Sequence, residues 1–130
     1  MNGTAYEEVL FEAEIMSALD AHDPSHAPLF LYYAPHLVHD PYEVPQPWLD
    51  RFSWMKDDTP KQARQYYSAM TAYLDTVVGN ITRKLKQKAM WDNTLLFMAS
   101  DNGGPIYGGQ GACNHPLRGG KLDPWEGGIR

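Results

Sequence analysis

Apolar side chains recur at helical spacing in two parts of the chain. Over residues 5–21 they fall mostly three and four positions apart with glutamates between them, which predicts an amphipathic helix. A second, longer helix is predicted from Pro60 over about six turns. Its apolar positions are Ala63, Tyr67, Met70, Leu74, Val77, Val78, Ile81 and Leu85. Between the two helices, Pro47 is suited to the first position of a helical turn over residues 47–52.

In two short runs of the sequence, apolar residues occupy consecutive positions, so both faces of an extended strand would be apolar. Residues 28–34 follow the first predicted helix, and residues 94–100 follow the second. This pattern is typical of central strands in a parallel sheet that helices cover. The alternation of helix and strand therefore predicts an α/β fold with a mostly parallel sheet flanked by helices.

A loop follows each predicted strand. Four prolines within residues 35–47 exclude a regular ladder there, so an ordered loop is expected. From Gly103 onward the chain holds nine of its eleven glycines, and regular structure is predicted largely to end at Asn102. Cations and aromatic side chains stand among glycines that permit close backbone approach, and this indicates a functional loop.

Asp101 and Asn102 stand directly at the tip of the second predicted strand. In open α/β sheets, ligands bind beyond the carboxyl ends of the strands, where a carboxylate and a carboxamide can hold a cation or an oxyanion. The sequence Asp-Asn-Gly-Gly also suits a turn, because Asn and Gly tolerate positive φ. From the residues alone, both a turn and a ligand pair remain open.

Histidines and a lysine in the loops are candidates for anion binding. His36 and His39 lie three apart, and as a zinc pair they would need at least one more ligand. An imidazole that hydrogen-bonds an anionic substrate is the functional alternative to a structural loop histidine. Lys121 is either a solvated loop cation or an ammonium that meets a sulfate or phosphate oxygen, with Arg118 second for that role.

The composition narrows the classes of function. With 130 residues the chain has the size of one domain, and 11 basic against 16 acidic side chains give a net charge of −5. The basic residues form no cluster that suggests nucleic-acid binding. The apolar stretches are far shorter than the roughly 20 residues of a membrane span, and residues 1–4 lack the features of a signal peptide.

Taken in order, five segments resemble the arylsulfatase family, most closely its arylsulfatase B type. They are Val38–Pro45, Tyr73–Gly79, Ser100–Gly104, Pro116–Lys121 and Trp125–Arg130. The resemblance extends from about Tyr6 to Arg130. It implies a partial alkaline-phosphatase-like α/β fold, in which residues 1–130 form the central segment of a sulfatase catalytic domain.

The resemblance also implies a function and a set of site residues. Members of the family hydrolyse sulfate esters, so the expected partner is an aryl sulfate or another small sulfate ester, or a sulfated glycan. Asp101 and Asn102 correspond to two oxygen ligands of a calcium ion, and hard oxygen donors suit that cation. His39 corresponds to the substrate-binding histidine near the ester oxygens, and Lys121 to the lysine that contacts the sulfate group.

The family nucleophile has no counterpart in these residues. It is a formylglycine made from the cysteine of a Cys-X-Pro-X-Arg motif, whereas Cys113 has its proline and arginine at other offsets. As the single cysteine of the chain, Cys113 is a buried thiol or half of a disulfide to a cysteine outside the chain. An N-terminal Asp-Asp pair of the calcium site and the C-terminal part of the domain are also missing. The chain alone is expected to be inactive and to bind calcium poorly.

Two alternatives to a sulfatase segment remain. One is a non-catalytic paralogue that binds sulfate, and the other is a phosphodiesterase or phosphonate hydrolase of the same superfold. Glycosylation sequons at Asn2 and Asn80 suggest a parent protein that is lysosomal or secreted.

Overall fold

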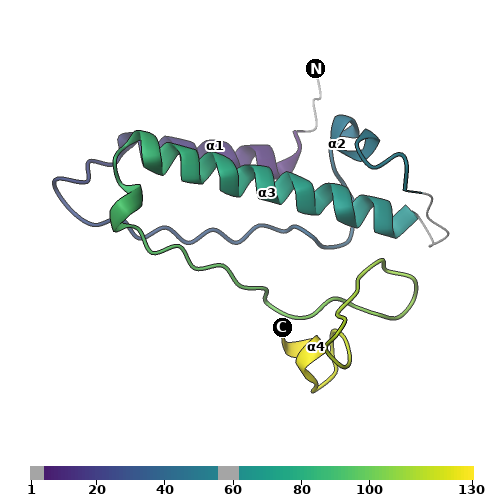
Figure 1. Ribbon diagram of the computed structural model, residues 1–130. Coiled ribbons are helices and arrows are strands. Elements are labelled where there is room, and N and C mark those ends of the chain that lie inside the picture. The colour runs from purple at the N-terminus through teal and green to yellow at the C-terminus, as the bar shows by residue number, and fades with distance from the viewer. Residues whose placement is uncertain (1–4, 56–61) are drawn as a thin grey trace.

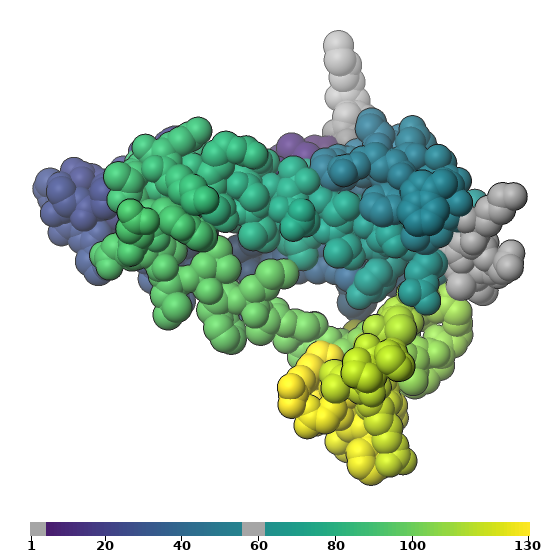
Figure 2. Space-filling model, viewed as in Figure 1, coloured from purple at the N-terminus to yellow at the C-terminus, as the bar shows by residue number. Residues whose placement is uncertain are grey.

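The computed structural model describes residues 5–55 and 62–130. Along these residues the elements are α1 (Glu7–Ala21), α2 (Gln46–Asp50), α3 (Ala63–Gln87), the 3-10 helix η2 (Trp91–Asn93) and α4 (Glu126–Ile129). Figure 1 shows α1 and α3 side by side, and α2 packs on α3. The C-terminal segment with α4 stands apart from this helical layer, as the yellow part of Figure 2 shows.

The predicted helices are present, but α1 does not follow the predicted amphipathic pattern in full, because Val9 and Leu10 are exposed and Glu8 is buried. The first predicted helix is α1, which begins at Glu7, and two glutamates in its first turn suit the positive end of a helix dipole. The long helix is α3; Pro60 and Lys61 lie outside the described residues. Two lysines in its last turn suit the negative end. The predicted turn at Pro47 is α2, where the proline stands in the first turn.

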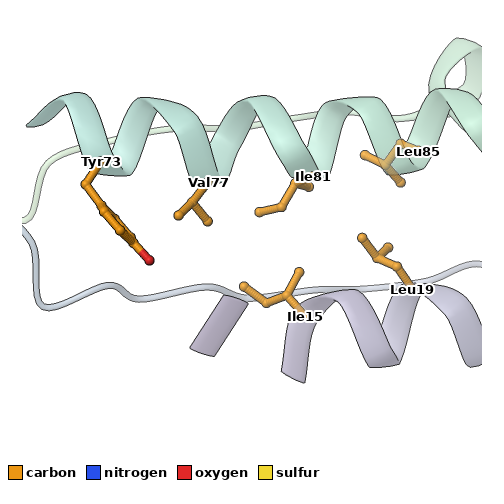
Figure 3. Close-up of a cluster of buried hydrophobic side chains, with 6 residues drawn as sticks. All are labelled: Ile15, Leu19, Tyr73, Val77, Ile81 and Leu85. Carbon is orange, nitrogen blue, oxygen red and sulfur yellow. The ribbon is translucent and has the colours of Figure 1, made fainter. Parts of the chain in front are cut away.

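The hydrophobic core lies between α1 and α3. Tyr73, Val77, Ile81 and Leu85 recur every four residues along α3, so their side chains share one face. Figure 3 shows this row facing Ile15 and Leu19 of α1. The rings of Tyr6 and Trp48 meet the Tyr73 ring edge to face at centroid distances of 5.2 Å each. Two helices and a short third one are therefore joined by a single apolar cluster.

The structure does not contain the predicted parallel sheet within its described residues. Residues 28–34 and 94–100 are drawn out beneath the helices in Figure 1, but the described residues contain no strand. A β-strand needs a neighbour for its backbone N–H and C=O groups, and neither segment has one. Their apolar side chains are accordingly exposed, with Phe30 at 90% and Tyr32 at 83% of full exposure.

None of the described helices combines the length and apolarity that crossing a bilayer requires.

Candidate functional site

The structure brings His39 and Lys121 together. Lys121 Nζ lies 3.3 Å from His39 Nε2, although the two residues are 82 positions apart in the chain. His39 is exposed and Lys121 is half-buried. A basic side chain and an imidazole therefore meet at the surface, where an anion in solution can reach both.

A backbone contact fixes the tautomer of His39 in this arrangement. Its Nδ1 lies 2.7 Å from the carbonyl oxygen of Asp40, which only accepts hydrogen bonds. Nδ1 therefore carries a hydrogen, and in the neutral ring Nε2 presents a lone pair to the Lys121 ammonium. When the ring is protonated, Nε2 becomes a donor, and it and Lys121 then both offer N–H groups to an anion.

Backbone hydrogen bonds hold the loop that carries Lys121. Lys121 N–H donates to the carbonyl oxygen of Gly104 at 3.1 Å, and Gly103 N–H donates to Gly128 at 3.0 Å. Gly119 has a φ of +84°, a region that disfavours residues with a side chain. The concentration of glycines thus serves close contacts between backbone segments, as the sequence predicted for this loop.

Asn114 joins two parts of this loop and was not predicted as a site residue. Its Nδ2 donates to the carbonyl oxygens of Gly104 at 2.7 Å and Gly119 at 3.1 Å, while its Oδ1 accepts from Gly104 N–H at 3.0 Å. A carboxamide offers both donors and an acceptor, which this bridge requires. A single asparagine among glycines carries no sequence signal for that role.

Asp101 and Asn102 lie in a polar bend just before this loop. Asp101 Oδ1 accepts the Asn102 backbone N–H at 2.8 Å, and Asn102 Nδ2 donates to the Gly103 carbonyl oxygen at 2.8 Å. Ser100 Oγ adds a contact of 2.6 Å to the Asn102 carbonyl oxygen. These contacts make a local bend, but Asn102, Gly103 and Gly104 lack the positive φ on which the predicted turn depended. Asp101 is exposed to solvent.

Asp101 and Asn102 offer oxygen ligands of the type that calcium prefers, but two residues are too few to form a calcium site. A calcium ion takes about six to eight oxygen ligands in proteins, and carboxylate and carboxamide oxygens are among them. In residues 5–55 and 62–130, no group of three or more His, Cys, Asp or Glu side chains is placed to hold a metal. The pair can supply part of a calcium site, and the other ligands have to come from elsewhere.

Other candidate residues have structural partners. His36 Nδ1 contacts Glu7 Oε2 at 2.9 Å, and the Arg118 guanidinium lies 3.7 Å from the centre of the Trp125 ring, a cation–π contact. Cys113 is exposed, so the alternative of a buried thiol is wrong. Asn80 Nδ2, the atom that a glycan would modify, donates to Glu12 at 2.6 Å. The second sequon, at Asn2, lies outside the described residues.

A tyrosine links the histidine loop to the glycine-rich loop. Tyr42 Oη donates at 2.6 Å to the carbonyl oxygen of Gln110 and lies 2.7 Å from its side-chain oxygen. Burial raises the pKa of Tyr42 above its ordinary value, which extends the pH range over which the hydroxyl is a donor. Beside it, an open depression of about 410 Å³ is lined by Asp40, Pro41, Tyr42, Gln62 and Tyr66. The surroundings of His39 thus include a concave surface.

The chain is similar to known sulfatases. The family model named Sulfatase matches residues 3–130. Arylsulfatase J of Mus musculus is 36% identical over 126 residues, which cover 96% of this chain and 20% of that protein. N-acetylgalactosamine-6-sulfatase of Homo sapiens is 31% identical over 128 residues, which cover 95% and 23%. The chain therefore spans about a fifth of the length of these relatives.

A solved structure agrees with these matches. The structure of Ps i-CgsB in complex with k-i-k-neocarrahexaose superposes with a TM-score of 0.86 at 32% identity, over 100% of this chain and 28% of that one. This supports the alkaline-phosphatase-like α/β class at the level of the family fold. The matches do not single out the arylsulfatase B type. With its family model matched almost from end to end, the chain belongs to the sulfatase family.

Proposed function

We propose that the protein expressed from its complete gene hydrolyses sulfate esters, and that His39 and Lys121 contact the sulfate group. The observation that carries this proposal is the 3.3 Å approach of Lys121 Nζ to His39 Nε2. The lysine ammonium is a compact charge with three donors, which suits the clustered oxygens of a sulfate. Membership of the sulfatase family supports the same reaction class.

The two side chains have a defined part in this reaction. Cleavage of a sulfate ester shifts negative charge between the sulfate oxygens and the leaving oxygen, and donors already in place lower the barrier. Lys121 holds the charged oxygens, and a protonated His39 donates from Nε2 near the ester oxygen. The Asp40 carbonyl keeps the ring oriented for this, since it accepts from Nδ1 at 2.7 Å.

Calcium and the nucleophile complete the proposed site. Asp101 and Asn102 would contribute two oxygen ligands to a calcium ion, which when bound supplies positive charge close to the sulfate. The expected nucleophile, a formylglycine, has no motif among these 130 residues. The 130 residues alone are therefore proposed to be inactive.

The proposed substrates are aryl sulfates and sulfated sugars. The similar structure of Ps i-CgsB holds k-i-k-neocarrahexaose, and one relative is an N-acetylgalactosamine-6-sulfatase, which supports a sugar sulfate. A lysosomal or secreted location is proposed from the family resemblance. The Asn80 sequon adds no support, because its Nδ2 is bonded to Glu12.

The test compares variants of the protein expressed from its complete gene. With 4-nitrophenyl sulfate as substrate, His39→Ala and Lys121→Ala should each lower kcat/KM by about 10²- to 10³-fold, the usual effect of removing one such donor. His26→Ala is the control, because that side chain is exposed and its hydrogen bond within the described residues is to Asp23. Wild-type activity in both variants would overturn the proposal, and preference for bis(4-nitrophenyl) phosphate would favour the phosphodiesterase alternative.

A further inference from the structure

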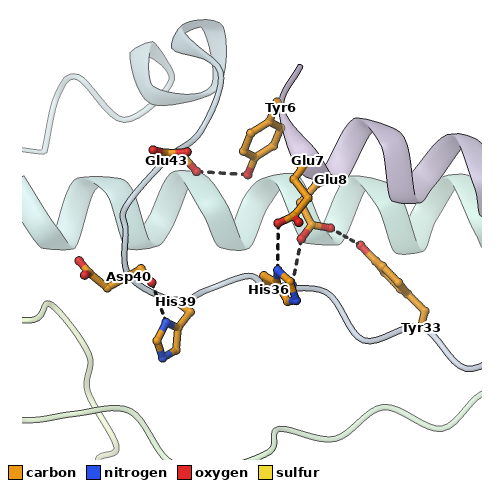
Figure 4. A network of polar contacts seen from close by, with 8 residues as sticks. All are labelled: Tyr6, Glu7, Glu8, Tyr33, His36, His39, Asp40 and Glu43. Atoms are coloured by element: carbon orange, nitrogen blue, oxygen red, sulfur yellow. Dashed lines mark hydrogen bonds and ion pairs between the residues drawn. The ribbon is translucent and has the colours of Figure 1, made fainter. Parts of the chain in front are cut away.

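The first turn of α1 contacts the His39 loop on the side that precedes the histidine. Glu8 Oε2 accepts from Tyr33 Oη at 2.8 Å, and Glu8 Oε1 accepts from the His36 backbone N–H at 2.9 Å. Figure 4 shows the carboxylate reaching both partners from the helix. Glu8 is only 2% exposed, which is unusual for a glutamate unless it is paired.

The residue that directly precedes α1 contacts the loop beyond the histidine. Tyr6 Oη donates to the Glu43 carbonyl oxygen at 3.2 Å, as Figure 4 also shows. Tyr6 and Glu8 thus hold the loop on either side of His39. A third contact, between Glu7 and His36 Nδ1, lies at the surface, where solvent weakens it.

These side-chain contacts matter because the loop has few backbone contacts of its own. Its prolines lack the N–H group that regular structure uses, and residues 36–45 contain no helix or strand. Burial, and then the Glu8 hydrogen bond, raise the pKa of Tyr33 far above its ordinary value, so its hydroxyl remains a donor. A buried carboxylate bound to two donors is a strong and directional anchor.

We propose that Glu8 and Tyr6 are positioning residues that hold His39 opposite Lys121. Neither residue touches the proposed sulfate; each acts through the loop that carries the histidine. The inference rests on the proposed function of His39, since it concerns the placement of that side chain. Without the two anchors the loop shifts, and Nε2 loses its place beside Lys121 Nζ.

The first test uses three glutamate variants of the protein expressed from its complete gene. Glu8→Ala should lower kcat/KM for 4-nitrophenyl sulfate by about 10- to 100-fold, the range found for partners that orient a functional side chain. Glu8→Gln should restore most of the activity, because its amide oxygen still accepts from His36 and its amide N–H donates to the Tyr33 hydroxyl. Glu14→Gln, on the exposed face of α1, is the matched control and should match the wild type.

Two milder variants cover the case in which Glu8→Ala does not fold. Tyr6→Phe and Tyr33→Phe each remove one hydroxyl and keep the ring, so the helix packing remains. Both should lower kcat/KM, and the double variant should lower it further. Tyr32→Phe is the control, because that neighbouring side chain is 83% exposed. Activity of Tyr6→Phe and Tyr33→Phe equal to that of Tyr32→Phe would overturn the proposal.

A double-mutant cycle separates positioning from general stability. If Glu8 or Tyr33 acts through His39, Glu8→Ala or Tyr33→Phe should not lower kcat/KM any further in a protein that already carries His39→Ala. An equal fold-loss in both backgrounds would contradict the proposal, since that is the result for a merely structural role. If the wild type does not hydrolyse the ester, or His39→Ala is fully active, the proposed function fails and this inference falls with it. If His39→Ala loses activity but the Glu8 and tyrosine variants behave like their controls, the positioning proposal fails and the proposed function stands.

Discussion

The α1–α3 pair and the glycine-rich segment 103–130 are held together by different kinds of contact. The helices meet through apolar side chains at regular spacing, with Leu19 and Val77 each 1% exposed. The segment 103–130 instead uses backbone hydrogen bonds and the amide of Asn114. Side-chain packing tolerates small adjustments, whereas backbone contacts leave no room for an added atom. The proposed site lies where a loop anchored to α1 meets the glycine-rich segment.

The largest expected effect is in the helical core. Leu19→Ala removes a side chain that is almost fully buried between α1 and α3, and it should lower the free energy of unfolding by about 2–5 kcal/mol. Chemical denaturation of the protein expressed from its complete gene measures this. Leu10→Ala, on the exposed side of α1, is the control. Equal losses for both variants would show that the α1–α3 cluster is not a core.

The same substitution should have opposite effects in the two regions. In Gly103→Ala the new methyl group would overlap the backbone carbonyl of Gly127, so the loop must open. This should lower the free energy of unfolding by about 1–3 kcal/mol. In Gly79→Ala nothing lies within 4 Å of the new methyl group, and alanine should stabilise α3 by roughly 0.5–1 kcal/mol. Melting temperatures of the two variants should therefore move in opposite directions. If both melting temperatures moved in the same direction, the two regions would not differ in how they accommodate an added methyl group.

The regularity of the helices made them predictable. Spacing alone located α1 and α3, and Pro47 located α2, because helix formation depends on residues a few positions apart. The predicted strands at residues 28–34 and 94–100 failed, since a strand depends on a neighbour that a local pattern does not contain.

The site residues were predictable only in part. Residue type marked His39 and Lys121 as candidates for anion binding, and the family resemblance assigned both to the sulfate group. Their approach across 82 positions is a tertiary contact that no local pattern contains. Glu8 looked like an ordinary first-turn glutamate, which normally faces solvent. Its burial depends on Tyr33 and on the backbone of His36, which become its neighbours only in the folded chain.

The smallest expected effect is at the surface between the helices. The Lys84 ammonium bonds the Asp20 carboxylate at 2.8 Å and holds the pKa of Asp20 below its ordinary 3.8. This contact stabilises the fold at pH values above the ordinary pKa, and the contribution is lost as the pH falls through the lowered folded-state pKa. Lys84→Met should return the Asp20 pKa toward its ordinary value in an NMR titration. An unchanged pKa would mean that the ion pair does not form in solution.

The most direct test of the proposed site is a double-mutant cycle on His39 and Lys121. The kcat/KM for 4-nitrophenyl sulfate is measured for each alanine variant and for the double variant, in the protein expressed from its complete gene. Residues that act on one group as a unit are strongly non-additive. The double variant should therefore be hardly slower than the slower single variant. Two losses that multiply would contradict the account, because they would show that the residues act independently.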